Sequence, residues 1–252
     1  MKIIVSVKQV PSRDSALKVN GVGTWLDESD LTFEMNEPDA YALEEALQLK
    51  EKLGGEVVVL SAGPARTTQT IREALAKGAD RAIHVSVEEE GTLDALATAE
   101  MLAKALEGES PDLILTGLQS DDLGYGQTGV VLAELLGFAH ATIVMEVEPL
   151  GNTVRVKREL EDGWFQNVVL PLPAILTIQS GIKKLRYATL MGIKKAKTKE
   201  VKVIPAAAAK PRAQIEQVYL PQRSKQSQIL SGDPKEVAKQ LVEKLKFEAR
   251  VL

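Results

Sequence analysis

Strand-like and helix-like segments alternate through the first half of this chain, and that alternation limits the fold more than any other feature. The expected strands are short apolar runs and cover residues 2–10, 57–60, 81–85 and 113–116. The expected helices lie between them and cover residues 39–52, 67–77, 93–106 and 127–136. This βαβ alternation predicts an α/β fold with a doubly wound, mostly parallel sheet and helices on both faces.

The pattern changes after residue 141. Three strand-like stretches cover residues 143–145, 153–157 and 164–170, and the turn signals between them are Gly151-Asn152 and Asp162-Gly163. Such turns join antiparallel strands, so we expect an added antiparallel portion beside the parallel sheet. The run LPAILTI, from residue 172, then has the uninterrupted apolar character of a strand buried on both faces.

A basic segment at about residues 183–199 places Leu190, Met191 and Ile193 between cationic side chains. Exposed apolar groups rimmed by charge are typical of a docking surface. The alternative is a short helix whose Leu190 and Ile193 face their own core at i, i+3 spacing. Ten cationic residues and one acidic residue lie between residues 183 and 212, which indicates either a solvated face or electrostatic steering of an acidic partner.

The chain divides by pattern into residues 1–203, the α/β domain with its basic segment, and residues 204–252. The second part begins as an extended linker without a periodic core pattern. It ends in a helix capped by Asp233, with Val237, Leu241 and Leu245 on one stripe. That stripe is expected to pack on a partner subunit or to fold back on its own domain.

Composition excludes several classes of function. The chain has no cysteine and two histidines, so thiolate metal sites, disulfides and thiol nucleophiles are excluded, and no metal site is expected. His84 sits at a strand end, where a structural role is expected. The net charge of −4 disfavours nucleic acid, and no long apolar run or signal-like start suggests a membrane segment or targeting segment. We expect a cytoplasmic bacterial or archaeal protein.

The most suggestive loop for chemistry is residues 117–129, which contains four glycines and opens a helix at Gln127-Thr128. Backbone N–H groups and a helix dipole at such a place can hold a phosphate. The loop matches neither a Walker loop nor G-x-G-x-x-G, so an ordinary glycine-rich start to a helix is equally compatible. It should meet the loops after residue 8 and at residues 60–64, where parallel strands end.

Several motifs, taken in order, resemble the small (beta) subunit of electron transfer flavoprotein. In the second half they are Val156-Lys157-Arg158-Glu159, Asp162-Gly163, Leu172-Pro173-Ala174, Arg186-Tyr187-Ala188-Thr189-Leu190 and Ile193-Lys194-Lys195-Ala196-Lys197. Upstream they are Val5-Ser6-Val7-Lys8-Gln9-Val10, Met35-Asn36, Ala42-Leu43-Glu44-Glu45-Ala46, Lys77-Gly78-Ala79-Asp80-Arg81 and Gly126-Gln127-Thr128-Gly129. The similarity covers nearly the whole chain.

The resemblance implies a Rossmann-like domain that buries a structural AMP. The matching cofactor-binding positions are Ser6, Asn36, Asp39, Ala62, Gly117, Gln119, Asp121, Gly126, Gln127 and Thr128. Two departures stand out: Gly126 replaces an Asn found in many members, and Glu37-Pro38 replaces a Pro-aromatic pair near the flavin ring. The redox group of the family is FAD, held mainly by the large (alpha) subunit, to which the C-terminal helix would bind.

The resemblance also implies an electron carrier without substrate chemistry of its own, linked to fatty acid β-oxidation. Its partners would be acyl-CoA and related flavin dehydrogenases as donors and a membrane-associated quinone oxidoreductase as acceptor. Leu190 matches a leucine that inserts into an apolar pocket of the dehydrogenase, and Glu159 matches a glutamate that influences flavin access. The matching docking residues are Tyr187, Ala188, Thr189, Leu190, Met191 and Ile193.

Two other functions remain compatible with the sequence. One is a free-standing adenine-nucleotide-binding module, which shares the parallel sheet and phosphate loop but explains neither the basic segment nor the tethered helix. The other is an electron-bifurcating relative, in which a second FAD replaces AMP in this subunit.

Overall fold

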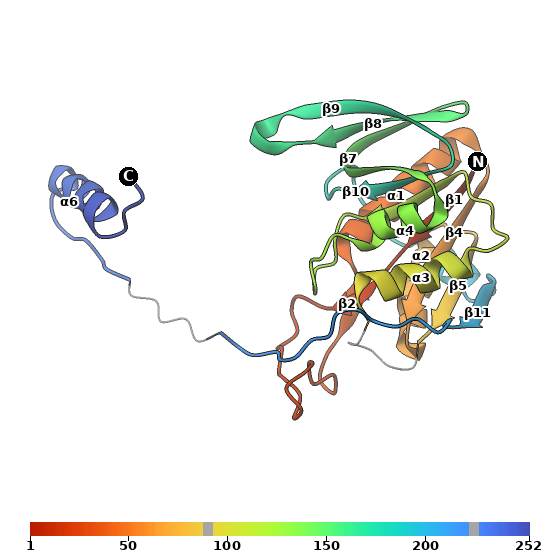
Figure 1. The fold of residues 1–252 in the computed structure, drawn as a ribbon, viewed down its shortest axis with the longest axis horizontal. Coiled ribbons are helices and arrows are strands. Elements are labelled where there is room, and N and C mark those ends of the chain that lie inside the picture. The colour runs from red at the N-terminus through yellow and green to blue at the C-terminus, as the bar shows by residue number, and fades with distance from the viewer. Residues whose placement is uncertain (88–92, 222–226) are drawn as a thin grey trace. The chain divides into compact units, whose positions relative to one another are not determined.

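The computed structural model describes residues 1–87, 93–221 and 227–252, and it divides into two compact units, Met1–Val218 and Tyr219–Leu252. The first unit is an α/β domain built on a nine-stranded sheet with the order β11-β5-β4-β1-β6-β10-β7-β8-β9 (Figure 1). Its strands are β1 (Lys2–Ser6), β4 (Glu56–Gly63), β5 (Arg81–Ser86), β6 (Leu113–Gly117), β7 (Ala139–Leu150), β8 (Thr153–Glu159), β9 (Phe165–Pro171), β10 (Ala174–Ile178) and β11 (Val201–Pro205). A separate two-stranded sheet joins β2 (Gln9–Pro11) and β3 (Phe33–Met35). The predicted α/β fold class is confirmed.

Helices cover both faces of the large sheet. They are α1 (Glu37–Leu53), α2 (Thr68–Lys77), α3 (Ala95–Ala105), α4 (Thr128–Leu136) and α5 (Leu190–Ala196), with short 3₁₀ turns η1 (Ala65–Thr67) and η2 (Glu161–Gly163). Along β1, Ile3 and Val5 join the core beneath α1 and α2, whereas Ile4 joins the core beneath α3 and α4. This alternation follows from the two-residue period of a strand, and it explains why the central strands are apolar throughout.

Helix ends fall where the sequence supplies suitable residues. α1 begins after Asn36 with Pro38 in its first turn, where a missing N–H costs nothing. It ends at Gly54, whose φ of 73° suits glycine and whose N–H donates to the Lys50 carbonyl at 2.8 Å. Consequently α1 is fixed in length, and its N-terminus is presented at the edge of the sheet where β1 and β6 end.

Strand β7 belongs to two kinds of sheet. Its first part pairs in parallel with β10, and its second part pairs antiparallel with β8, which pairs in turn with β9 (Figure 1). A register shift and a left-handed residue, Ile143 with φ 57°, mark the change of partner. The predicted antiparallel portion is therefore confirmed, but β7 is longer than the predicted residues 143–145.

Two details of the sequence-based prediction are wrong. The strand predicted over residues 2–10 is divided, because β1 ends at Ser6 and β2 begins at Gln9 in a different sheet. The extended linker was predicted to begin after residue 203, but the next two residues still belong to β11, which ends at Pro205 and pairs in parallel with β5. Beyond it, the Val218 N–H donates to the Gly23 carbonyl at 2.8 Å, within the first unit.

The second unit contains α6 (Pro234–Phe247), at the predicted position. The Asp233 side chain caps it by accepting the Lys235 N–H at 3.1 Å, and Pro234 occupies its first turn. Leu241 and Val242 on this helix are 48% and 52% exposed. Within the described residues, no helix combines the length and the apolar character needed to cross a membrane.

Candidate functional site

A pocket opens at the edge of the sheet where β1, β4 and β6 end. In chain order the sheet grows from β1 through β4 to β5, and then returns to place β6 on the other side of β1. The chain therefore reverses its direction of growth between β1 and β6. Loops diverge at such a switch point, and this is where open α/β sheets bind ligands.

Asp39 joins the two central loops of the pocket. One carboxylate oxygen accepts the Lys8 N–H at 2.8 Å, and the other accepts the Gly117 N–H at 2.8 Å. The side chain is buried, and burial raises the pKa of Asp39 to about 6 even though both hydrogen bonds lower it. Asp39 thus fixes the ends of β1 and β6 relative to the first turn of α1.

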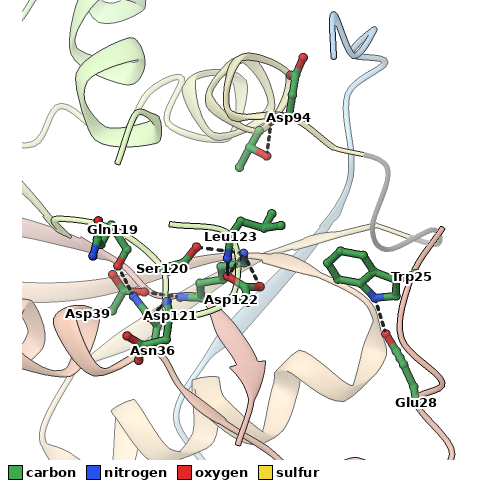
Figure 2. Close-up of polar contacts among 12 residues, drawn as sticks. Trp25, Glu28, Asn36, Asp39, Asp94, Gln119, Ser120, Asp121, Asp122 and Leu123 are labelled. Atoms are coloured by element: carbon green, nitrogen blue, oxygen red, sulfur yellow. Dashed lines mark hydrogen bonds and ion pairs between the residues drawn. The ribbon is translucent and has the colours of Figure 1, made fainter. Parts of the chain in front are cut away.

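Asn36 holds the glycine-rich loop in the same way. Its Nδ2 donates to the Gln119 carbonyl at 2.9 Å, and its Oδ1 accepts the Asp121 N–H at 2.9 Å (Figure 2). The nitrogen and the oxygen of this buried side-chain amide are therefore both hydrogen-bonded. The residue before α1 sets the course of the loop at residues 117–121.

Lys8 and Asp122 form an ion pair inside the pocket lining. The Lys8 Nζ lies 2.7 Å from Asp122 Oδ2 and 3.3 Å from Ser120 Oγ. Burial raises the pKa of Asp122, but the Lys8 charge and the hydrogen bonds from Lys8, Ser120 and the Leu123 N–H together outweigh it, and the pKa is lowered. Because Asp122 is neutralised by its partner, the acidic group does not repel an anion from this side of the pocket.

Glycines permit close approach of the backbone at two points. A Cβ on Gly117 would lie 2.4 Å from Asp39 Oδ1, and a Cβ on Gly129 would lie 2.6 Å from Thr116 Oγ1. Gly129 sits in the first turn of α4, so the helix start can approach β6 closely. Gln127, Thr128 and Gly129 at this helix N-terminus line the pocket, and the free N–H groups of a helix N-terminus favour a negatively charged group.

The opposite wall comes from the long loop before α1. Trp25 lines the pocket and its Nε1 donates to Glu28 Oε1 at 3.2 Å (Figure 2). Arg66 stacks on Phe33 with its guanidinium carbon 3.5 Å from the ring centroid, and also contacts Glu28 at 3.4 Å. Trp25 and Phe33 therefore contribute aromatic surface to the pocket, and Arg66, from η1, contributes a cation.

Asp94 connects the pocket to the segment that follows β11. Its Oδ1 accepts the Ala97 N–H at 2.7 Å as the cap of α3, while Oδ2 accepts the N–H groups of Arg212 and Ala213 at 2.6 and 2.9 Å. These backbone hydrogen bonds lower the pKa of Asp94, Ala97 contributing most. The chain after β11 is thus fastened beside the pocket.

Most of the cofactor-binding residues expected from the sequence meet in this pocket. All of them line it except Asp121, whose carboxylate instead accepts the Glu37 N–H at 3.3 Å and pairs with Arg13 at 3.2 Å. The expected residues that line the pocket are Ser6, Asn36, Asp39, Ala62, Gly117, Gln119, Gly126, Gln127 and Thr128. Sequence reasoning missed the side chains of Lys8, Ser120 and Asp122 and the wall of Trp25, Phe33 and Arg66.

The basic segment forms α5, whose apolar side chains point outward. Leu190 is 87% exposed and Met191 62%, and Tyr187 is 92% exposed. The alternative that Leu190 and Ile193 face their own core is therefore wrong, because Ile193 is also exposed and only Ala196 of this helix is buried. Thr189 caps α5 by accepting the Gly192 N–H at 3.0 Å, and Ala188 is partly buried against the core.

Glu159 ends β8 and accepts a hydrogen bond from Gln179 Nε2 at 3.2 Å. Gln179 follows β10, so this bond ties the end of the β8–β9 hairpin to the central sheet. His84 is buried, and its Nε2 lies 2.9 Å from the Gly63 carbonyl, consistent with the expected structural role. In the described ranges, no group of three or more acidic, histidine or cysteine side chains could hold a metal ion.

Comparisons with known proteins agree on one family. The electron transfer flavoprotein domain model matches residues 23–209. Electron transfer flavoprotein subunit beta of Bradyrhizobium diazoefficiens is 41% identical over the whole of both chains. The proteins of that name from Methylophilus methylotrophus and Homo sapiens are 36% and 40% identical, with 95% and 81% of this chain and 96% and 81% of theirs covered.

Proposed function

Because this chain belongs to the electron transfer flavoprotein family as a beta subunit, we propose that it is the small subunit of a heterodimeric, FAD-containing electron carrier. In this proposal the carrier accepts electrons from flavin dehydrogenases such as acyl-CoA dehydrogenases. It passes them to a membrane-associated quinone oxidoreductase. This chain contributes a nucleotide site and a docking surface, and performs no substrate chemistry of its own.

The pocket suits AMP. An adenine nucleotide needs donors for its phosphate and an apolar surface for its base. Lys8 and the N-terminus of α4, with Gln127 and Thr128, supply donors, and Gly117 leaves room for close approach of the backbone. Val87 and Leu123 supply apolar lining. Asp39 and Asn36 would act by holding the loops, since their side-chain atoms are already bonded to backbone groups.

The observation that carries the docking role is the exposure of large apolar side chains on α5. Leu190, 87% exposed, stands at the tip, with Met191 and Ile193 beside it. Lys194 and Lys195 follow on the same short helix and are exposed. A central apolar anchor with a rim of charge is the usual arrangement of an energetic hot spot, and the charge adds encounter rate and selectivity.

FAD accepts electrons from the donor and passes them on when it is bound, and the large subunit would hold most of it. This chain would complete the flavin surroundings near Glu159, whose carboxylate acts electrostatically rather than by transferring a proton. The second unit, Tyr219–Leu252, would reach the large subunit, with the apolar stripe of α6 packed on it.

A ligand count tests the carrier proposal. We would co-express this chain with the large subunit encoded beside it, purify the complex, release its ligands with acid and quantify FAD and AMP. One FAD and one AMP per heterodimer is the expected result. Two FAD without AMP would indicate the electron-bifurcating alternative, and no complex with only an adenine nucleotide on this chain would indicate the free-standing module.

Leu190→Ala tests the docking surface. Truncating a central apolar anchor typically costs ~2 kcal/mol of binding or more, about 30-fold in affinity, so electron transfer from an acyl-CoA dehydrogenase should slow at subsaturating carrier. FAD and AMP contents should stay unchanged, because Leu190 is exposed and supports no core contact. An unchanged rate would remove this surface from the proposal.

A further inference from the structure

The docking surface, Tyr187 to Ile193, lies within a longer connection, residues 179–200, between β10 and β11. Arg186 stands immediately before the surface and is bound to α1. Its Nε lies 2.8 Å from Glu44 Oε2, its Nη2 lies 3.0 Å from Glu44 Oε1, and its backbone N–H donates to Glu44 Oε2 at 3.2 Å. Its Nη1 also lies 2.5 Å from Glu51 Oε1. One arginine thus satisfies two carboxylates of a single helix.

Glu44 is an unusual partner because its side chain is only 5% exposed. Burial would raise the pKa of Glu44, but the hydrogen bonds from Arg186 and Gln48 outweigh burial and lower it. A buried carboxylate without such a partner is costly, so the native fold strongly favours Arg186 in this position. Next to it, Lys183 Nζ lies 3.5 Å from Glu45 Oε2, a second contact between this connection and α1.

The far side of the docking surface is bound to α2. A Cβ on Gly192 would lie 2.2 Å from the Ala76 carbonyl oxygen, so α5 rests directly on the backbone of α2. Arg72 Nη1 donates to the Ala196 and Lys199 carbonyls at 2.6 and 2.9 Å. These bonds hold the C-terminal end of α5 as Arg186 holds the residues before it.

We propose that Arg186, bound to Glu44 and Glu51, is a positioning residue that keeps the docking surface in its binding-competent conformation before a donor arrives. The inference rests on the proposed docking function. Large apolar side chains in water favour collapse onto the nearest apolar surface, and Leu190 lies only four residues after Arg186 in the sequence. The contacts with α1 fix where the chain leaves the domain, and this keeps Leu190 directed outward.

The expected effect depends on the fraction of molecules whose docking surface is in the binding-competent conformation. Apparent affinity falls in proportion to the fraction of molecules that are binding-competent, so a drop of that fraction to between a third and a tenth raises KM about threefold to tenfold. The limiting rate of electron transfer in the docked complex should not change. This division between KM and kcat separates positioning from general damage to the subunit.

The experiment uses the heterodimer with an acyl-CoA dehydrogenase as donor and compares three variants. Arg186→Lys keeps the charge but loses the bidentate geometry, and should raise KM for the carrier about threefold to tenfold with kcat, FAD and AMP unchanged. Leu190→Ala reports on docking itself. Arg155→Lys is the matched control, because Arg155 forms an exposed ion pair with Glu148 on the hairpin, and it should match the wild type.

Each result has a definite meaning. If Leu190→Ala raises KM but Arg186→Lys does not, positioning by Arg186 is wrong and the docking function stands. If neither changes KM, the docking function itself fails. Loss of FAD or AMP, or a lower kcat, in Arg186→Lys would assign Arg186 to general stability and overturn the inference. Should Arg186→Lys not fold, Glu51→Gln replaces it, since Glu51 is exposed and holds the same guanidinium.

Discussion

Asp39 and Gly117 approach each other so closely that no further atom fits between them. Asp39 Oδ1 accepts the Gly117 N–H at 2.8 Å, and a Cβ on Gly117 would lie 2.4 Å from that same oxygen. It would also lie 2.7 Å from Pro38 Cβ. The end of β6 and the first turn of α1 are therefore in direct contact through a backbone amide and a carboxylate, and the pocket is shaped by this contact.

We expect Gly117→Ala to destabilise the pocket. The added methyl must push Asp39 and Pro38 away from β6, and overpacking of this kind usually costs about 1–3 kcal/mol. The AMP content of the purified heterodimer should fall, and its thermal unfolding temperature should decrease. Gly21→Ala is the control, because a Cβ at Gly21 meets nothing within 4 Å. Full AMP content in Gly117→Ala would contradict the role given to this contact.

We expect Asp39→Asn to be destabilising although it removes a buried charge. Both carboxylate oxygens accept backbone N–H groups, from Lys8 and Gly117, and an amide can accept only one of them. The other N–H would face an NH₂ group, and an unsatisfied buried donor costs about 1–3 kcal/mol. Chemical denaturation of the heterodimer measures the change. Asp30→Asn, at a residue whose side chain is 71% exposed, should change little, and equal effects would count against this account.

The pH dependence of stability should carry a signature of Asp39. Its pKa is about 6 in the folded protein, against an ordinary value of 3.8, because burial disfavours the charge. The folded state therefore holds this proton more tightly, and the contribution is largest near pH 4 and is lost as pH rises through about 6. Unfolding free energies measured between those pH values should decline less in Asp39→Asn than in the wild type. Parallel pH profiles for the two proteins would sink this prediction.

A charged cluster at the opposite ends of the central strands should give the folding stability the reverse pH dependence. Glu109 Oε2 lies 2.6 Å from Arg81 Nη2 and 2.6 Å from Lys2 Nζ. The hydrogen bond from Arg81 lowers the pKa of Glu109 most, burial opposes it, and the hydrogen bond from Lys2 lowers the pKa further, so that it is about 2. Its contribution is present above the ordinary value of 4.5 and is lost as pH falls towards 2.

Glu109→Gln should therefore cost about 1–3 kcal/mol of unfolding free energy at pH 7 and less near pH 3. AMP content should be unchanged, because this cluster lies at the start of β1, away from the pocket. Glu107→Gln is the matched control, since Glu107 forms an exposed pair with Lys104. A pH-independent loss in Glu109→Gln would show that the ion pairs are not its cause.

The sheet was predictable because its central strands are buried on both faces and read as apolar runs. β11 was missed for the opposite physical reason. It is an edge strand with Val203 61% exposed, and Lys202 interrupts its short apolar run, so only its pairing with β5 makes it a strand. Pairing partners far apart in sequence leave no local pattern.

The pocket was predictable in part because the central strands that end at it were predictable. The glycine-rich loop and the ends of β1 and β4 follow from strand order, and the family resemblance placed Asn36 and Asp39 there. The ion pair of Lys8 with Asp122 joins residues 114 positions apart, and Trp25 lies in a long loop without periodicity. Neither the ion pair nor the place of Trp25 in the pocket wall leaves a local pattern in the sequence, because both depend on how the chain folds.

The connection from β10 to β11 is anchored in one sheet at both ends, on opposite sides of β1. Those strands are five steps apart, a span of about 24 Å at ~4.8 Å per step. Because they run parallel, the chain must also return from the end of β10 to the start of β11, and such a crossover takes about a dozen residues or more. Residues 179–200 therefore contain spare length, which is taken up by α5 and its flanks. Because doubling a loop adds only about 0.6 kcal/mol of closure entropy, insertions near Tyr187 should be tolerated by the fold. The tip that carries Leu190 can thus change in length and shape while the sheet beneath it stays intact.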